Sequence, residues 1–435
     1  MERIEAACVR NEHKLWMYKE YLLPSKRFLL TVHSLTATQL SKLDTLTDKF
    51  VKHWAGLPRS ATNAVIHLKG GLDLRSVSEL YTEAHATSHA RTRLKGDEVI
   101  NHVLDTTLQR EGDYLRKKCT TSEAELMFRE VLHLNSVDGE IPNYNGDRAT
   151  QLQNKFSHMV QEEVKNRVRF ESQEKWEEDV RSLTVQGKTL ALAAAEKEDV
   201  LWKSYMYNLK AGTLKFFLNA SLDTLPTAAN LKRWKKSPSD LCKLCRGRQT
   251  TNHVLNICSV GKDTGRWEWR HNCVLNYIVS SVNTTKYTVY SDLAGHQTAG
   301  GGTVPPEICV TGQRPDIVIL DNTAKTINLF ELTCPLESNL DKRNLDKNNK
   351  YAHFLTDCSG YDCTVTCFEV SSKGFISTRN HTSLAKLHKY MNTSIKLSTF
   401  KKNISALAVY ASYHIWLCRS DASFIQPPYL PAPAQ

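Results

Sequence analysis

Three cysteines and one histidine lie close together in the middle of the chain. Cys242, Cys245, His253 and Cys258 follow the pattern Cys-x2-Cys-x7-His-x4-Cys. At this spacing, two short turns can bring three thiolates and one imidazole around a tetrahedral ion, which is a ligand set of structural Zn2+ sites. The other cysteines show no such spacing. The pattern therefore predicts a structural zinc site, with unrelated buried cysteines as the alternative.

Positive charge is dense around this cluster. Residues 231 to 248 contain seven Lys and Arg against the single acid Asp240. Such density on a small module is typical of contact with phosphates. Trp234 could stack on an unpaired base, although a tryptophan at helical spacing is more often a core residue. The residues predicted to bind nucleic acid are Lys232, Arg233, Lys235, Lys236, Lys243, Arg246 and Arg248.

Two acids further along the chain could form a second metal site. Asp316 opens one run of strand composition, and Glu331 lies near the end of the next, with 14 residues between them. A hairpin of that size can bring the two carboxylates together. Paired carboxylate oxygens suit Mg2+ or Mn2+, which can activate water and neutralise the leaving oxygen of a phosphodiester. The arrangement predicts a metal-dependent nuclease with these two acids as metal ligands.

The lysine expected beside such acids is displaced. In the PD-(D/E)xK pattern of metal nucleases it lies two residues beyond the second acid, where this chain has Thr333. Lys347 and Lys350 follow on the next predicted helix, on one face, where either could orient water or stabilise charge. We expect Lys350 to be the better candidate, because Tyr351 beside it can pack the helix on the sheet. The alternative is that the acids cap a turn or are solvated and the lysines form an exposed face.

Strand-like and helical segments surround these residues. The runs RPDIVIL and INLFELT, separated by the turn-prone DNTAKT, predict a hairpin that carries both acids. The other elements expected in this α/β unit are a helix over about 338 to 356, a strand over CTVTCFEV and helices over about 381 to 393 and 397 to 417.

The first half of the sequence has a helical pattern. Leu40, Leu43, Phe50 and Trp54 recur at helical spacing after Thr36, a plausible cap. Capping-box pairs predict further helices that begin near 77 and 123. A polar stretch from 147 to 183 with mixed charges predicts a long, largely solvated helix. The run RWEWRHNCVLNYIVSSV predicts an amphipathic helix in which His271 has a structural role.

Several segments resemble a known family. The runs RPDIVIL, FELTCPLESNL, KNNKYAHFLTDC and FEVSSKGFIS are similar to the restriction-like endonuclease domain of certain non-LTR (LINE-type) retrotransposon proteins. The nuclease site of that family combines an Arg/Lys-Pro-Asp strand, a second acid and a Lys-x2-Lys-Tyr helix. The resemblance implies that Asp316, Glu331, Lys347 and Lys350 take these roles, completed by Arg314 and Tyr351.

The resemblance extends upstream. DTLPTAANLKRWKK, the cysteine cluster with HVLNIC, and GRWEWRHNCVL are similar to the linker and zinc knuckle of the same elements. HKLWMYKEYLLPSKRFLL and KHWAGLPRSATNAVIH are similar to the thumb that follows the reverse-transcriptase palm. A palm needs two adjacent aspartates for its metals, and this chain has no Asp-Asp pair. We therefore expect a truncated retrotransposon protein that is not a reverse transcriptase by itself.

The expected fold is an α-helical N-terminal half with thumb-like and linker helices, a small zinc knuckle, and an α/β restriction-endonuclease-like (PD-(D/E)xK) domain. The predicted parts are a thumb-like helical region without palm (1–115), a helical linker (116–236), a CCHC zinc knuckle (237–265), a restriction-like endonuclease domain (266–420) and a disordered tail (421–435).

Composition limits the class of protein. With 435 residues, 41% of them hydrophobic, and 24% charged, the chain is expected to form two to four globular domains. A net charge of +11 favours a polyanionic partner. We find no apolar run long enough for a membrane span and no signal peptide, so we expect an intracellular protein with reduced thiols and no membrane partner.

Together these patterns predict a metal-dependent DNA endonuclease that nicks one strand for target-primed reverse transcription. Its expected cofactors are structural Zn2+ and catalytic Mg2+ or Mn2+, with no small-molecule cofactor. Its expected partners are a DNA target and, as a second candidate, element RNA, and its expected location is the nucleus. The alternative is a catalytically inactive, nucleic-acid-binding remnant of a retroelement.

Overall fold

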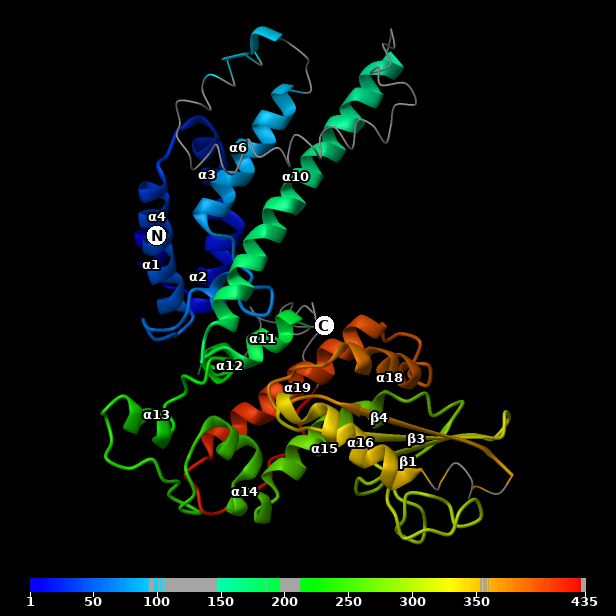
Figure 1. Cartoon of the computed structure of the whole chain (residues 1–435). Coiled ribbons are helices and arrows are strands. Elements are labelled where there is room, and N and C mark those ends of the chain that lie inside the picture. Colours follow the sequence, from blue (N-terminus) through cyan, green and yellow to red (C-terminus); the bar gives the residue numbers. More distant parts are fainter. Residues whose placement is uncertain are drawn as a thin grey trace. The chain divides into compact units, whose positions relative to one another are not determined.

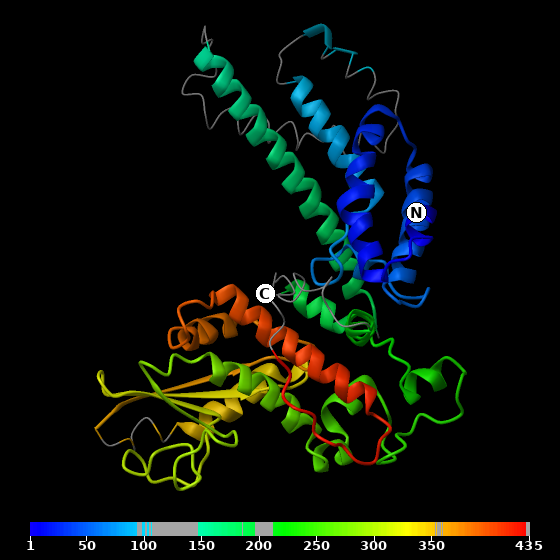
Figure 2. The same ribbon diagram turned by 180° about the vertical axis from the view of Figure 1, so that it is seen from behind.

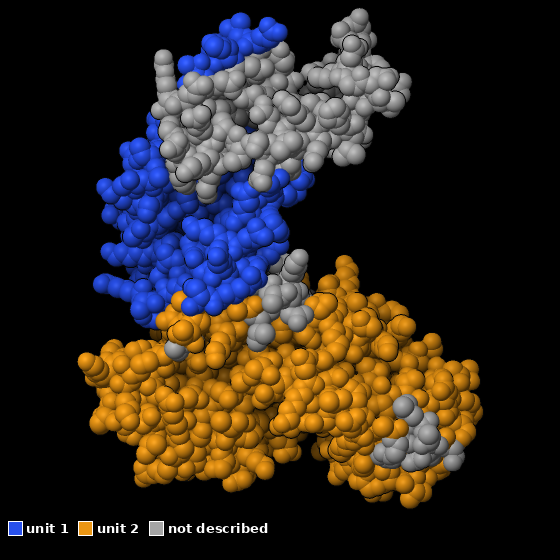
Figure 3. Space-filling model, viewed as in Figure 1, with its two compact units in different colours: residues 1–182 blue, residues 183–435 orange. Residues whose placement is uncertain are grey.

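The computed structural model of the chain describes residues 1–93, 98–100, 102, 103, 106, 147–184, 186–195, 212–352, 354, 358 and 360–431. They form two compact units, Met1–Ser182 and Leu183–Gln435 (Figure 3). The division falls inside the predicted helical linker, and the predicted knuckle and nuclease segments share the second unit. The helix predicted to begin near 123 lies outside the described residues.

The described part of the first unit is helical (Figure 1). The predicted helix after Thr36 is confirmed. The Thr36 hydroxyl accepts from the backbone amide of Gln39 at 3.3 Å, and the Gln39 side chain accepts from the backbone amide of Thr36 at 2.9 Å. The helices are α1 (Glu2–Glu5), α2 (Asn11–Met17), η1 (Tyr18–Leu22), α3 (Leu23–Val32), α4 (Ala37–Trp54), α5 (Ala64–His67), α6 (Val77–Arg93) and α10 (Asp147–Arg181).

Helix α10 matches the long helix predicted from the polar stretch. It is also anchored within its unit. Arg169 reaches Glu79 of α6 at 3.0 Å, and the Gln173 side chain donates to the carbonyl of His67 at 2.9 Å. Both Glu79 and Gln173 are buried, so these contacts fix the middle of a helix whose sequence contains few apolar residues.

The second unit contains a four-stranded sheet in the order β1-β2-β3-β4. Its strands are β1 (Thr288–Ser291), β2 (Ile317–Asp321), β3 (Thr326–Thr333) and β4 (Asp362–Glu369). The predicted hairpin is confirmed, because β2 and β3 pair antiparallel with Ile317 opposite Phe330. Strand β4 pairs parallel to β3 after a crossover through α16 (Leu340–Tyr351).

Both faces of this sheet are covered. On one side lie α15 (Arg266–Ser281), α18 (Thr378–His388) and α19 (Leu397–Leu417) (Figures 1 and 2). Ile317, Ile319 and Phe330 of the sheet pack in one core with residues of these helices. Val318 and Leu329 point to the opposite face and pack with Tyr351 of α16. Alternating residues of one strand thus belong to two cores, which explains the continuous apolar runs in the sequence. The structure is a mixed helical and α/β protein.

Shorter helices precede the sheet. They are α11 (Lys188–Ala195), α12 (Thr213–Ser221), α13 (Ala228–Arg233), η3 (His253–Ile257) and α14 (Ser259–Asp263), and η4 (Glu337–Asn339) precedes α16. In the part of the chain that the structure describes, no helix combines the length and apolar character that a membrane span requires.

The C-terminal segment differs from its prediction. Proline-rich composition predicted disorder from residue 421 onward. Instead, the Phe424 ring lies 5.7 Å from the Trp269 ring, and the Trp269 indole donates to the carbonyl of Pro427 at 2.8 Å. Leu430 also packs against this cluster. The prediction is therefore wrong for residues 421–431, because their apolar side chains find a partner on α15 that composition cannot show.

Candidate functional site

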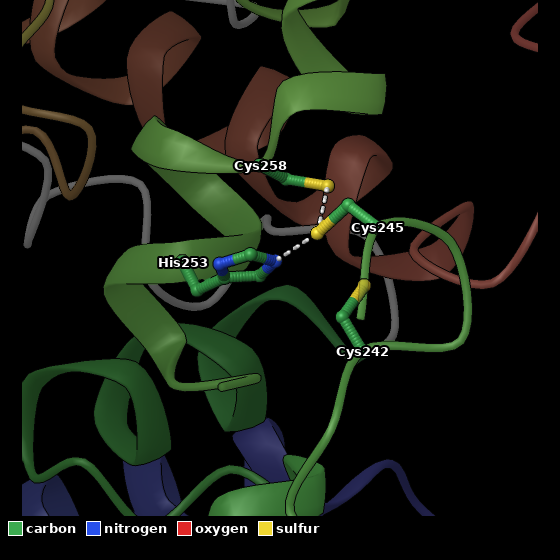
Figure 4. Close-up of side chains that lie close together, drawn as sticks. All are labelled: Cys242, Cys245, His253 and Cys258. Carbon is green, nitrogen blue, oxygen red and sulfur yellow. Dashed lines mark hydrogen bonds between the residues drawn. The ribbon is translucent and has the colours of Figure 1, made fainter. Parts of the chain in front are cut away.

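The four predicted zinc ligands converge. Ligand atoms of Cys242, Cys245, His253 and Cys258 all lie within 4.8 Å of one another (Figure 4). The Cys245 sulfur is 3.2 Å from His253 Nε2 and 3.7 Å from the Cys258 sulfur. Three sulfurs and one imidazole nitrogen at such distances are a donor set that could bind zinc.

A tight turn and a π-helix position these ligands. The Cys242 amide donates to the carbonyl of Gly247 at 2.7 Å, and the Arg246 amide donates to the carbonyl of Cys242 at 3.1 Å. A Cβ at Gly247 would lie 3.0 Å from His253 Cε1 and 3.5 Å from the Cys245 sulfur. Any larger residue at this position would therefore force the ligands or the turn to shift by a few tenths of an ångström. His253 begins η3 and Cys258 follows it.

The charge states of these groups suit a metal site. Burial lowers the pKa of His253, which keeps its imidazole neutral. Burial opposes ionisation of Cys242, but the backbone amides of Cys245 and Leu244 donate to its sulfur and lower its pKa. Burial raises the pKa of Cys258 to about 11, and the neighbouring thiols add to this shift. Metal binding would have to displace the thiol protons.

The hairpin brings the two predicted acids together. Asp316 directly precedes β2, and its backbone amide donates to Glu331 Oε2 at 3.0 Å. Asp316 Oδ2 accepts from the backbone amide of Leu332 at 2.8 Å. Both carboxylates are buried, with Asp316 8% and Glu331 2% exposed. Each acid is thus held by the backbone of the strand that carries the other.

One of the two candidate lysines reaches this pair. Lys347 Nζ donates to Glu331 Oε1. Lys350 Nζ instead lies 2.8 Å from the Tyr351 hydroxyl and 4.5 Å from the centre of that ring. The Arg314 side chain pairs with Asp292. The structure therefore groups Asp316 and Glu331 with Lys347, and it places Lys350, the lysine that the sequence favoured, on the neighbouring tyrosine.

The charges in this group depend on one another. Burial raises the pKa of Glu331, and the charge of Asp316 raises it further. For Asp316 burial acts in the same direction, but the adjacent His271 and Lys347 outweigh it and lower the pKa. The carboxylates raise the pKa of Lys347 despite its burial. The two buried acids therefore favour a positively charged group beside them.

His271 also belongs to this group, although the sequence indicated only a structural role for it. Its Nε2 lies 3.2 Å from Asp316 Oδ2 and 3.2 Å from the carbonyl oxygen of Leu332. Both partners are acceptors, so Nε2 carries the proton and donates. Burial opposes a charge on the ring, but Asp316 outweighs it and raises the pKa of His271 to about 9. A separation of 45 residues gives no spacing signal.

A third buried carboxylate lies next to this group, and the sequence did not indicate it. Glu369 ends β4 and is fully buried. Its Oε1 accepts from the Asn344 side chain at 2.7 Å, and its Oε2 accepts from Arg379 at 3.0 Å. Asn344 lies three residues before Lys347 on α16. These contacts tie the helix that carries the lysine to the sheet.

The predicted cationic surface is exposed. Lys232 and Arg248 both pair with Asp240, at 2.9 and 3.5 Å. Trp234 is half-buried. Among the residues that the structure describes, the other five cations form no ion pair. They are Arg233, Lys235, Lys236, Lys243 and Arg246.

The sequence has a recognisable relative. It is 23% identical over 288 residues to the "Retrovirus-related Pol polyprotein from type-2 retrotransposable element R2DM" of Drosophila melanogaster, and the match covers 64% of this chain. The chain is related to a retrotransposon polyprotein. The match spans only 23% of that relative, so the similarity supports a retroelement origin and leaves the polyprotein's activities open. No protein-family model matches the sequence.

Proposed function

We propose that the chain is a DNA endonuclease module of a retroelement that nicks one strand and binds nucleic acid through a zinc knuckle. The observation that carries the proposal is the convergence of Asp316, Glu331 and Lys347 in a chain related to a retrotransposon polyprotein. Two carboxylates and an ammonium at one end of the two central strands are the side chains that metal-dependent phosphodiester hydrolysis requires. The restriction-like fold and the predicted domain boundaries belong to the same proposal.

Asp316 and Glu331 would hold Mg2+ or Mn2+, which supplies activation of water and neutralisation of the leaving oxygen. The chain's own residues prepare this site. The Leu332 amide and His271 fix the Asp316 oxygen from two sides. Lys347 would shift its hydrogen bond from Glu331 to a phosphate oxygen or the attacking water, since its partner carboxylate would then be neutralised by the bound cation.

The zinc knuckle would supply affinity for nucleic acid. Its exposed cations would contact phosphates, with a DNA target and element RNA as the partners of this class and the nucleus as the site of action. Phosphate contacts position a protein without reading sequence, so the target sequence does not follow from them.

A non-catalytic nucleic-acid-binding remnant is the second candidate. One observation favours it: the Lys347 ammonium pairs directly with the Glu331 carboxylate. A stable internal ion pair could take the place of the bound cation and leave only the binding surface in use.

Nicking of supercoiled and branched DNA in Mg2+ or Mn2+ separates the two candidates. We expect the parent to nick and the Asp316→Asn and Glu331→Gln variants to lose at least about 100-fold in rate, because metal ligation is removed. Asp346→Asn is the matched control, since Asp346 is an exposed acid on α16. A parent that is inert on both substrates with both metals supports the remnant; full activity of Asp316→Asn refutes the site.

A further inference from the structure

Two adjacent residues of α15 face the two candidate sites. Arg270 Nη1 donates to the carbonyl of Leu255 at 2.9 Å, and its Nη2 donates to Asn256 Oδ1 at 3.0 Å. Both acceptors belong to η3, the segment between the zinc ligands His253 and Cys258. The next residue, His271, donates to Asp316 and to the carbonyl of Leu332. One helix turn thus touches both the zinc cluster and the carboxylate pair.

Arg270 also contacts the sheet. Its Nη2 donates to the carbonyl of Cys334, directly beyond β3, at 2.9 Å, and its Nη1 lies 3.3 Å from the Ser412 hydroxyl of α19. The side chain is only 2% exposed. A planar guanidinium can satisfy these acceptors together only when η3, the end of β3 and α19 hold one arrangement. A shift of η3 would take two acceptors away from this buried guanidinium, which is unfavourable.

The shape of η3 depends on the ligands at its ends. Residues 241 to 258 form a small module around His253 and the cysteines, and such modules gain much of their folding free energy from the metal. Loss of zinc should therefore release η3 first. Arg270 would then lose two of its acceptors, and His271, on the same rigid helix, would lose its fixed position.

We propose that Arg270 and His271 are positioning residues that couple the order of the zinc cluster to the placement of Asp316. The structural part of this inference stands without catalysis, and its consequence for nicking rests on the proposed function. The zinc cluster would then act both as a binding module and as a support for the carboxylate pair.

Hydrogen exchange on the full chain tests the coupling directly. The reporter is the Leu332 amide, which donates to Asp316 at 2.8 Å. We expect zinc removal to increase exchange both in η3 and at residues 331 to 333. Arg270→Lys keeps the charge but loses the planar fork, and Asn256→Leu removes one acceptor, so both should increase exchange at 331 to 333 with zinc present. These two variants test the relay even if zinc extraction unfolds the module.

Mn2+ affinity provides a second readout. We expect His271→Phe to weaken Mn2+ binding by about tenfold or more, as is usual for groups that orient a metal ligand. His271→Gln, which keeps a donor, should recover part of this loss. Glu268→Gln is the control, because Glu268 is an exposed residue of α15.

The results separate this inference from the proposed function. Faster exchange in η3 with no change at 331 to 333, in the zinc-free protein and in both variants, would overturn the coupling. Equal Mn2+ affinity of His271→Phe and the parent would remove His271 from it. A parent that couples exchange and binds Mn2+ but nicks no DNA would refute the proposed function and leave the coupling supported.

Discussion

The ammonium of Lys347 pairs with Glu331 across 16 residues of sequence, from a helix to the middle of a sheet. In the strand position where a metal nuclease of this pattern has its lysine, the chain has Thr333. The helix therefore supplies the cation that the strand lacks. Because α16 connects β3 to the parallel strand β4, the crossover that the sheet requires also carries this side chain over the carboxylates.

The two lysines of α16 should differ sharply in function. Lys347→Ala should reduce nicking by about 100-fold, the usual effect of removing one group that stabilises transition-state charge. Lys350→Ala should change the rate little, because that ammonium lies on Tyr351. Rates of plasmid nicking under single-turnover conditions measure both effects.

Lys342→Ala is the control, since Lys342 is an exposed lysine of the same helix. A larger loss in the Lys350 variant than in the Lys347 variant would restore the ranking made from sequence and contradict the geometry.

The geometry favours Lys347 over Lys350 for a reason that helix periodicity explains. Tyr351 is buried against the sheet, and the residue one turn before it on the same face is Lys347. Lys350 precedes Tyr351 directly, so the backbone turns it away. The hairpin and the cysteine cluster were predictable because short spacing and strand composition determine them. The contact of His271 with Asp316 was not, because it depends on how α15 packs on the sheet.

The turn at Gly247 should control metal binding. Gly247→Ala places a methyl group 3.0 Å from His253 Cε1. Because this contact pushes the ligand out of place, zinc affinity should fall by about tenfold or more. Competition with a chromogenic chelator measures the affinity. Gly312→Ala is the control, because a Cβ at Gly312 meets no atom within 4 Å. Unchanged zinc affinity in the Gly247 variant, or a parent without stoichiometric zinc, would count against the predicted site.

Binding of nucleic acid should be sensitive to salt through the knuckle. Replacing Lys235, Lys236 and Lys243 with Ala should lower the slope of log affinity against log salt by about 2 to 3 if each lysine contacts one phosphate. Lys232→Ala should have a smaller effect, because Lys232 is already paired with Asp240. Fluorescence anisotropy over a range of salt measures the slope.

Lys386 of α18 and Lys389, which directly follows that helix, are exposed and provide a control in which positive charge is lost at a different surface. If their replacement changes the slope as much as the knuckle variant does, the binding is spread over the whole cationic chain.

The contact between Asn344 and Glu369 should hold Lys347 in register. In Asn344→Ala, the Glu369 carboxylate keeps only its contact with Arg379, and α16 loses its hydrogen bond to β4 at this position. Lys347 should then leave Glu331 for part of the time. We expect nicking to fall by about tenfold, with DNA affinity unchanged, because a small misplacement of a catalytic group has a cost of this kind or larger. Asn349→Ala is the matched control, since Asn349 is exposed on the same helix. Equal nicking rates in the two variants would mean that packing of Leu340 and Tyr351 alone fixes the helix.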